Sequence, residues 1–227
     1  MWGQSMFRVK ICGITTVPDA HVAVEAEADA IGLNFYPASP RFCPIENARE
    51  IAANVPKGIC KVGVFVNATA HDIRRTVEVV GLDLVQLHGD EPPELLGEIR
   101  GLPVMKAFRV DGDLSAIAAY LAICHRDRCM PRMVLIDALR PGQYGGTGAT
   151  LNWPAIHDGR RHACGVPLVL AGGLTPANVA AAIAATRPWA VDTASGVEIS
   201  PGKKSAPRVR EFVEAALAAF ARANARS

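Results

Sequence analysis

The sequence predicts an α/β fold in which eight strands and eight helices alternate along the chain and close into one parallel barrel. Short apolar runs alternate with helical patterns over the whole chain, and runs such as 31–35, 62–66 and 168–171 are apolar at nearly every position. Strands that are buried on both faces of a parallel sheet show this pattern. No linker or shift in composition divides the 227 residues. We therefore expect residues 1–227 to form a single domain, a (β/α)8 or TIM barrel.

The expected strands are bounded by turn residues and rich in β-branched and aliphatic side chains. They are Phe7 to Cys12, Ala30 to Phe35, Cys60 to Val66, Leu84 to His88, Val104 to Phe108, Met133 to Asp137, Leu168 to Ala171 and Val191 to Thr193. A helix is expected after each strand. The helices are Asp19 to Glu27, Ile45 to Asn54, Ala70 to Val80, Glu94 to Arg100, Ser115 to Cys124, a short segment around Pro154 to Gly159, Ala177 to Ala185 and Val209 to Ala225.

Helix starts carry recognisable signals. Pro18, Pro44, Pro92 with Pro93, and Pro176 precede or open four of the helices, and Thr69 is a candidate N-cap for a fifth. The competing architecture is an open doubly wound sheet, which would carry a glycine fingerprint directly after the first strand. The segment that follows the first strand, Cys12-Gly13-Ile14-Thr15, is not such a fingerprint.

Composition and charge exclude several classes of protein. The formal net charge is +2 and acidic and basic residues are interleaved, so we expect no nucleic-acid partner. A basic cluster at Lys203, Lys204, Arg208 and Arg210 is interpreted as the solvated start of the last helix. No run approaches the roughly 18 apolar residues of a membrane span, and residues 1–6 lack the core of a signal peptide. We expect a cytoplasmic protein that does not bind membranes and, by default, a monomer.

The cysteines and histidines indicate neither disulfides nor a metal site. Cysteines stand at positions 12, 43, 60, 124, 129 and 164 without a CxxC pair, which is typical of reduced thiols in a cytosolic protein. His157 and His162 are too sparse a pair for a zinc site. We expect no metal and no organic cofactor.

Polar residues gather at the predicted strand ends, where a barrel of this kind places its active site. They are Cys12, Asn34, Asn67, Gln86, His88, Arg109, Asp137 and the segment Asp192 to Gly196. Glycines follow the last two strands, as Gly172-Gly173 and as Ser195-Gly196, and Tyr144 to Gly148 adds another glycine-rich loop. Loops after the seventh and eighth strands are the usual phosphate seat of this fold. The glycines therefore predict a phosphorylated small-molecule substrate, although tight turns alone would also use them.

Cys12 and Asp137 are the candidate proton-transfer groups. Both end strands that lie across the ring from one another, so that one could remove a proton and the other deliver one, as a tautomerisation requires. Lys10 is on the same strand face as Cys12 and would favour the thiolate. Arg41 follows the second strand and could meet a substrate carboxylate as a bidentate donor. The alternatives are a buried structural thiol, a carboxylate that caps a turn, and a solvated loop arginine.

A set of motifs spread over nearly the whole chain carries a resemblance to a known family. They are Lys10 to Thr15, Asn34 to Pro37 with Ser39 and Arg41, Val62 to Asn67, Val85 to Gly89, Gly145 to Gly148, Leu170 to Leu174, Ser195 to Glu198 and Pro201 to Lys204. In this order the motifs resemble those of phosphoribosylanthranilate isomerase of tryptophan biosynthesis.

The resemblance implies an Amadori rearrangement of N-(5-phosphoribosyl)anthranilate to 1-(2-carboxyphenylamino)-1-deoxyribulose 5-phosphate by general acid/base catalysis, without a cofactor. It implies that Asp137 is the general acid, that Cys12 is the base, and that Arg41 contacts the anthranilate carboxylate. The other expected substrate-binding residues are Lys10, Gln86, His88 and Asp192. The expected phosphate-binding residues are Gly146, Gly172, Gly173, Ser195 and Gly196.

One departure from the family pattern stands in the eighth-strand loop, where Ala194 replaces an expected hydroxyl. Two other functions are weighed against the isomerase. A related phosphate-binding barrel such as indole-glycerol-phosphate synthase should rely on a catalytic lysine and glutamate set, which the pairing of Cys12 with Asp137 disfavours. A non-catalytic barrel that senses a sugar phosphate would need the glycines but not the acid and base.

Overall fold

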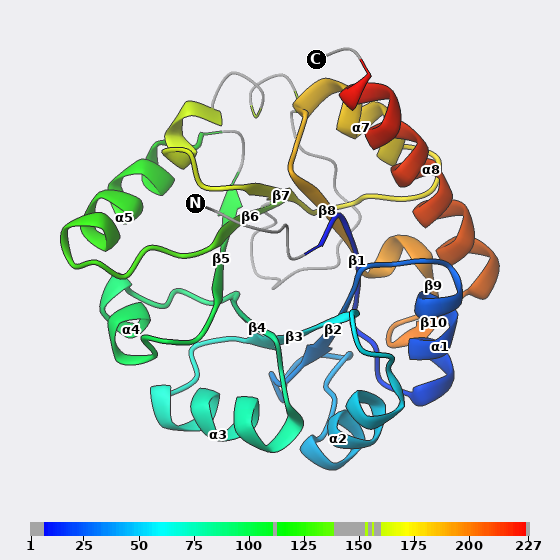
Figure 1. Ribbon diagram of the computed structural model, residues 1–227, viewed down its shortest axis with the longest axis horizontal. Helices are drawn as coiled ribbons and strands as arrows, with labels where there is room; N and C mark the ends of the chain where they lie inside the picture. Colours follow the sequence, from blue (N-terminus) through cyan, green and yellow to red (C-terminus); the bar gives the residue numbers. More distant parts are fainter. Residues whose placement is uncertain (1–6, 111–112, 139–152, 154–155, 157–159, 226–227) are drawn as a thin grey trace.

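The computed structural model describes residues 7–110, 113–138, 153, 156 and 160–225. Eight parallel strands pair in sequence order, and β8 pairs with β1 to close the barrel, as predicted. The strands are β1 (Val9–Cys12), β2 (Ala30–Asn34), β3 (Cys60–Phe65), β4 (Leu84–Leu87), β5 (Val104–Val110), β6 (Met133–Ala138), β7 (Leu168–Leu170) and β8 (Ala190–Thr193). Figure 1 looks down the barrel, with the strands in the centre and the helices around them.

The helices follow the predicted order. They are α1 (Val17–Glu25), α2 (Ile45–Asn54), α3 (Ala70–Val80), α4 (Pro93–Glu98), α5 (Ser115–Arg126), α7 (Val179–Thr186) and α8 (Ala206–Asn224), with short 3-10 helices η1 (Arg160–Ala163) and η2 (Ser195–Val197). The short helix expected around Pro154 to Gly159 lies largely outside the described residues.

The start of α3 agrees with the prediction, whereas the start of α7 lies later in the chain than predicted. Thr69 caps α3 by accepting a hydrogen bond from the Asp72 backbone N–H, as expected for a threonine at this position. Pro176 does not open α7, which begins three residues later at Val179. The Asn178 side chain accepts from the Thr175 N–H and donates to the Gly173 carbonyl, so this segment forms a turn before the helix starts.

Two apolar cores hold the barrel together. An inner cluster fills the space between the strands and includes Val62, Met105, Leu135 and Val169. A larger outer cluster lies between the strands and the helices and includes Val9 and Ile11 of β1. Because neighbouring strand residues point to opposite faces, Lys10 and Cys12 point into the barrel while Val9 and Ile11 contact the helices.

A small hairpin that the sequence did not predict follows β8. Strands β9 (Glu198–Ser200) and β10 (Lys203–Lys204) pair antiparallel beside β1 and between α1 and α8 (Figure 1). The interpretation of Lys204 as part of a solvated helix start is therefore wrong, because Lys204 is only 4% exposed. Lys203, Arg208 and Arg210 do lie on the surface.

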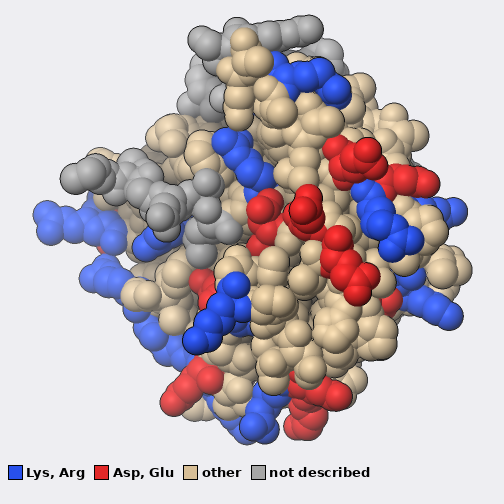
Figure 2. Space-filling model, turned by 45° about the vertical axis from the view of Figure 1, so that its right-hand side comes forward, with Lys and Arg blue, Asp and Glu red and all other residues tan. Residues whose placement is uncertain are grey.

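Charged side chains of both signs are interspersed over the face of the molecule that Figure 2 shows. This arrangement agrees with the interleaved charges of the sequence. Among the helices that the structure describes, none combines the length and the apolar composition needed to cross a bilayer.

Candidate active site

A pocket lies at the carboxyl ends of the barrel strands and brings most of the predicted site residues together. Those that line it are Cys12, Arg41, Gln86, His88, Asp137, Gly172, Gly173, Asp192 and Ser195. They come from six of the eight strand-to-helix connections, so the barrel itself assembles the site from distant segments of the chain. Asn34, Tyr36, Ser39, Thr193 and Ala194 line the same pocket.

Two of the predicted site residues that the structure describes do not line this pocket. Lys10 is fully buried beneath it, and Gly196, in η2 after β8, lies against the Leu174 carbonyl. A direct substrate contact by Lys10 does not fit this placement, because the neighbouring side chains cover its ammonium group. Gly146 lies outside the described residues.

Cys12 stands at the end of β1 with its side chain against Gly32 of the neighbouring strand. A Cβ atom at Gly32 would lie 2.6 Å from Cys12 Sγ and 3.1 Å from Lys10 Cε. Only a glycine at this position leaves room for the thiol and for the lysine stem. Burial raises the pKa of the Cys12 thiol, and this effect outweighs the opposing influence of the Lys10 and Lys204 cations. Lys10 does lower the pKa of Cys12, as expected, but the effect of burial is larger and the net shift of the pKa is upward.

Beneath the pocket floor a buried ionic layer crosses the barrel. Lys10 Nζ donates to Asp192 Oδ2 at 2.9 Å and to Gln86 Oε1 at 2.9 Å. Burial works to lower the pKa of Lys10, but Asp192 and Cys12 outweigh it, and the pKa lies above its ordinary value. The second carboxylate oxygen of Asp192, Oδ1, has no hydrogen-bond partner among the described residues. Oδ1 is thus a buried acceptor without a donor, on a residue that lines the pocket.

Gln86 links this layer to the candidate general acid. Its Nε2 lies 2.7 Å from His88 Nδ1, and His88 Nε2 lies 3.2 Å from Asp137 Oδ2. The His88 Nε2 contact is not aligned as a hydrogen bond in the described part of the chain. A line of polar side chains thus runs from β1 through β4 to Asp137 on β6.

The loops after β7 and β8 approach each other closely. Gly172 and Gly173 have φ angles of 85° and 66°, a region that favours glycine. At Gly196 a Cβ atom would lie 1.9 Å from the Leu174 carbonyl oxygen, so no other residue fits without movement of the backbone. Thr193 Oγ1 donates to the same carbonyl at 2.8 Å. Ala194 lines the pocket without a hydroxyl, whereas its neighbour Ser195 carries one.

Arg41 reaches the pocket from the loop that follows β2. The Ser39 hydroxyl accepts from the Arg41 backbone N–H at 3.1 Å and from Asn34 Nδ2 at 3.1 Å, which fixes the loop to the end of β2. The guanidinium is paired with Glu198 of the β9–β10 hairpin. Burial works to lower the pKa of Arg41, but this carboxylate outweighs it and holds the pKa above its ordinary value.

Comparison with known proteins gives one consistent answer. The sequence model described as N-(5'phosphoribosyl)anthranilate (PRA) isomerase matches residues 9–215. The N-(5'-phosphoribosyl)anthranilate isomerase of Rubrobacter xylanophilus is 46% identical over 93% of this chain and 99% of the relative. That of Myxococcus xanthus is 47% identical over 92% of this chain and 95% of the relative. This chain belongs to the N-(5'-phosphoribosyl)anthranilate isomerase family.

Solved structures of this isomerase family share the fold. The phosphoribosyl anthranilate isomerase from Thermotoga maritima superposes with a TM-score of 0.84 at 40% identity and covers 94% of this chain and 100% of its own. A phosphoribosyl anthranilate isomerase in complex with reduced 1-(o-carboxyphenylamino)-1-deoxyribulose 5-phosphate gives a TM-score of 0.80 at 39% identity, over 94% of this chain and 100% of its own. The expected isomerase family and the expected TIM barrel are thereby confirmed.

Sequence reasoning missed four residues that shape the site of this isomerase. Gly32 makes room for the Cys12 thiol, and Ser39 fixes the loop that carries Arg41. Glu198 accepts hydrogen bonds from Arg41, and Lys204 donates to the Cys12 carbonyl at the end of β1. Ser39, Glu198 and Lys204 stand inside the family motifs, which was the only available signal for them. In the described part of the chain, no group of three or more His, Cys, Asp or Glu side chains could hold a metal ion.

Proposed function

We propose that this isomerase rearranges N-(5-phosphoribosyl)anthranilate to 1-(2-carboxyphenylamino)-1-deoxyribulose 5-phosphate in tryptophan biosynthesis. The single observation that carries the proposal is that Cys12 and Asp137, a thiol and a carboxyl group from different strands, line one pocket with Arg41 and the glycines of the last two loops. Arg41 suits a carboxylate and the glycine-rich loops suit a phosphate, so the pocket suits a substrate that carries both groups.

Asp137 is the proposed general acid. In its protonated form it donates a proton to the ribose ring oxygen, the bond from that oxygen to C1 breaks, and the nitrogen lone pair forms a Schiff base. The His88 Nε2 atom, 3.2 Å from Asp137 Oδ2, lies where an N–H group would stabilise the carboxylate that this step leaves behind.

Cys12 is the proposed base. Its thiolate takes the proton from C2, the electron pair of that bond moves to neutralise the iminium nitrogen, and an enolamine forms. The enolamine then tautomerises to the ketone when a proton leaves the C2 hydroxyl and another is added at C1. Because burial raises the pKa of Cys12, the free enzyme holds mainly the thiol at neutral pH. The positive charge of the Schiff base next to C2 favours the thiolate when it is needed.

The remaining pocket residues are proposed to bind the substrate. Gly172, Gly173 and Ser195 would hold the phosphate through N–H and hydroxyl groups, and Asp192 Oδ1 would accept from a sugar hydroxyl. Arg41 would meet the anthranilate carboxylate, and His88 would contact the substrate beside Asp137. Gln86 would contribute to the pocket floor. Lys10 would hold Gln86 and Asp192 from below the floor without touching the ligand.

The rival functions fit the pocket less well. Among the described residues that line it, none is a lysine or a glutamate, the pair on which an indole-glycerol-phosphate synthase should rely. A sugar-phosphate sensor would not need an acid and a base in one pocket.

The deciding experiment follows the fluorescence of phosphoribosylanthranilate after addition of purified protein. We expect rapid loss of signal with the wild type. We expect Cys12→Ser and Asp137→Asn each to lower kcat by orders of magnitude, while binding of the reduced product analogue is retained. A folded wild type without activity would overturn the assignment of the substrate. A variant with normal turnover would overturn the role of the residue it replaces.

Three expectations from the sequence belong to this proposal. Residues 1–227 would form a single domain, the chain would act in the cytoplasm, and it would be a monomer. Light scattering coupled to size-exclusion chromatography tests the last of these, and a mass of twice 24.1 kDa would contradict it.

A further inference from the structure

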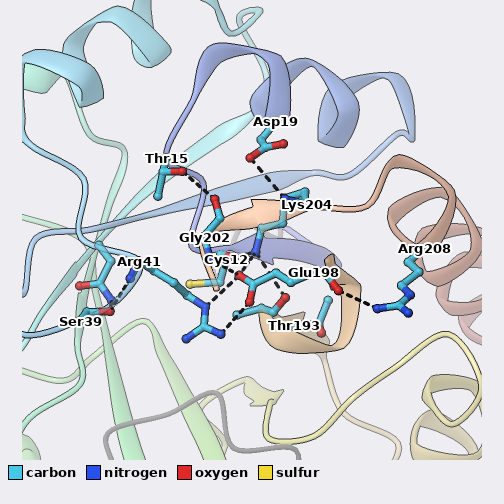
Figure 3. Close-up of polar contacts among 12 residues, drawn as sticks. Cys12, Thr15, Asp19, Ser39, Arg41, Thr193, Glu198, Gly202, Lys204 and Arg208 are labelled. Atoms are coloured by element: carbon cyan, nitrogen blue, oxygen red, sulfur yellow. Dashed lines mark hydrogen bonds and ion pairs between the residues drawn. The ribbon is translucent and has the colours of Figure 1, made fainter. Parts of the chain in front are cut away.

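A buried cluster of three charged side chains joins the arginine loop to the β9–β10 hairpin. Arg41 Nε donates to Glu198 Oε1 at 2.8 Å and Arg41 Nη2 donates to Glu198 Oε2 at 2.7 Å. Lys204 Nζ donates to Glu198 Oε1 at 2.8 Å. Figure 3 shows the arginine and the lysine converging on this one carboxylate beside Cys12.

The geometry of the pair leaves part of the guanidinium available. Glu198 takes one N–H from Nε and one from Nη2, which are on the same side of the planar group. The Nη1 edge on the other side carries the remaining donors, and it can make a second bidentate contact with a carboxylate. Since Arg41 lines the pocket, this second carboxylate can come from a ligand.

Lys204 ties the same carboxylate to the strand that carries Cys12. Its ammonium donates to the Cys12 carbonyl at 2.6 Å and to the Ala194 carbonyl at 3.3 Å. Burial works to raise the pKa of Glu198, but the hydrogen bonds from Arg41 and Lys204 outweigh it and lower the pKa. Two cations and one carboxylate leave one net positive charge in the cluster. Without Lys204 the pair of Arg41 and Glu198 would be neutral and would attract an anionic group less strongly.

We propose that Glu198 is the positioning residue for Arg41: it holds the guanidinium side-on so that the free edge receives the carboxylate of the substrate, while Lys204 balances its charge. The inference rests on the proposed function, which supplies the substrate carboxylate. Glu198 acts through Arg41 and does not itself touch the substrate.

The experiment measures how strongly the enzyme discriminates between two ligands. One is the reduced product analogue, reduced 1-(o-carboxyphenylamino)-1-deoxyribulose 5-phosphate, and the other is the same compound prepared from aniline, which lacks the carboxyl group. The ratio of their Kd values, measured by calorimetry, is the carboxylate discrimination. For the wild type we expect a ratio of roughly tenfold or more, as one charge-assisted bidentate contact gives.

Glu198→Gln keeps the shape but replaces one acceptor oxygen with an NH2 group, so only one of the two hydrogen bonds from Arg41 can form and the guanidinium is no longer held side-on. We expect this loss of orientation to outweigh the added net positive charge and to reduce the discrimination to near unity. Arg41→Ala should do the same, and the double variant should be no worse than Arg41→Ala alone, because both residues act through one contact. Lys203→Met, on the exposed side of the same hairpin, is the matched control and should keep the wild-type ratio. A purely structural role of Glu198 would weaken both ligands equally and leave the ratio unchanged.

The results distinguish a failure of the positioning role of Glu198 from a failure of the proposed function. If Glu198→Gln keeps the wild-type ratio, or if its effect adds to that of Arg41→Ala, the positioning role is overturned. If the wild type neither turns over phosphoribosylanthranilate nor binds the carboxylated analogue, the proposed function has failed instead. Should Glu198→Gln not fold, Glu198→Asp keeps the charge but withdraws the carboxylate by one methylene, and we expect it to lose discrimination as well.

Discussion

The side-chain amide of Gln86 fixes which ring nitrogen of His88 carries the proton. Gln86 Oε1 accepts from Lys10 Nζ, which has only donors, so the amide cannot be turned around without placing N–H groups against an ammonium. Gln86 Nε2 therefore faces His88 Nδ1, at 2.7 Å, and must donate to it. The neutral imidazole then has its hydrogen on Nε2, the nitrogen that lies 3.2 Å from Asp137 Oδ2. A lysine buried under the pocket thus sets the tautomer of a histidine in it.

This relationship predicts a spectroscopic result. In the wild type the ¹⁵N chemical shifts of the neutral form of His88 should report an unprotonated Nδ1 and a protonated Nε2. Gln86→Glu should change this, because the introduced carboxylate accepts from a protonated Nδ1 and allows both ring nitrogens to carry hydrogen. The exposed His21 and His125 serve as internal controls in the same spectrum, and their signals should be unaffected. A protonated Nδ1 in the wild type would contradict the assigned orientation of Gln86.

Gly32→Ala should damage catalysis more than binding. The new Cβ would lie 2.6 Å from Cys12 Sγ and 3.0 Å from Cys12 Cα, so the thiol must move. A displacement of about 1 Å at a reacting group can lower kcat by on the order of a hundredfold. Binding of inorganic phosphate by the loops after β7 and β8, on the other side of β1 from Gly32, should be nearly unchanged. Gly97→Ala in α4 is the control, since a Cβ there meets nothing within 4 Å, and its kcat should equal that of the wild type.

The barrel could be predicted because its signals are local. Each strand is a short apolar run next to a helix with its own start signal, as at Thr69 before α3. The β9–β10 hairpin could not be predicted in this way. Its strands have three and two residues, and they are held by contacts between Lys204 and the Cys12 carbonyl, 192 positions apart in the sequence.

In the candidate site, too, residues with a local sequence signal could be predicted and residues defined by distant contacts could not. Cys12 and Asp137 were found because they are polar groups at strand ends, a position that the sequence shows directly. Glu198 was not found, because its importance lies in a contact with Arg41 across 157 positions. Lys10 was placed on the correct face of β1, but only the structure shows that Gln86 and Asp192 enclose its ammonium below the pocket.

The raised pKa of Cys12 should show in the rate at which its thiol is alkylated. Burial raises this pKa, so the fraction of thiolate in the free enzyme still increases with pH above the ordinary cysteine value of about 8.5. Because iodoacetamide reacts with the thiolate, the rate of Cys12 alkylation should still rise with pH through this range. Mass spectrometry of the Cys12 peptide after timed alkylation between about pH 6 and pH 10 measures this rate. A rate that is already independent of pH at neutral pH would contradict a raised pKa of Cys12.

Removal of Lys10 should cost far more stability than removal of a surface lysine. Lys10→Met leaves Asp192 as a buried carboxylate without its cation, and breaking such a pair typically costs about 3 to 5 kcal/mol. Lys61→Met breaks the pair with Asp83, whose side chain is 45% exposed, and should cost at most about 1 kcal/mol. Urea unfolding measures both. The double variant Lys10→Met with Asp192→Asn should recover part of the loss, because the unpaired charge is then gone. Equal losses for the two single variants would show that the layer under the pocket does not depend on charge pairing.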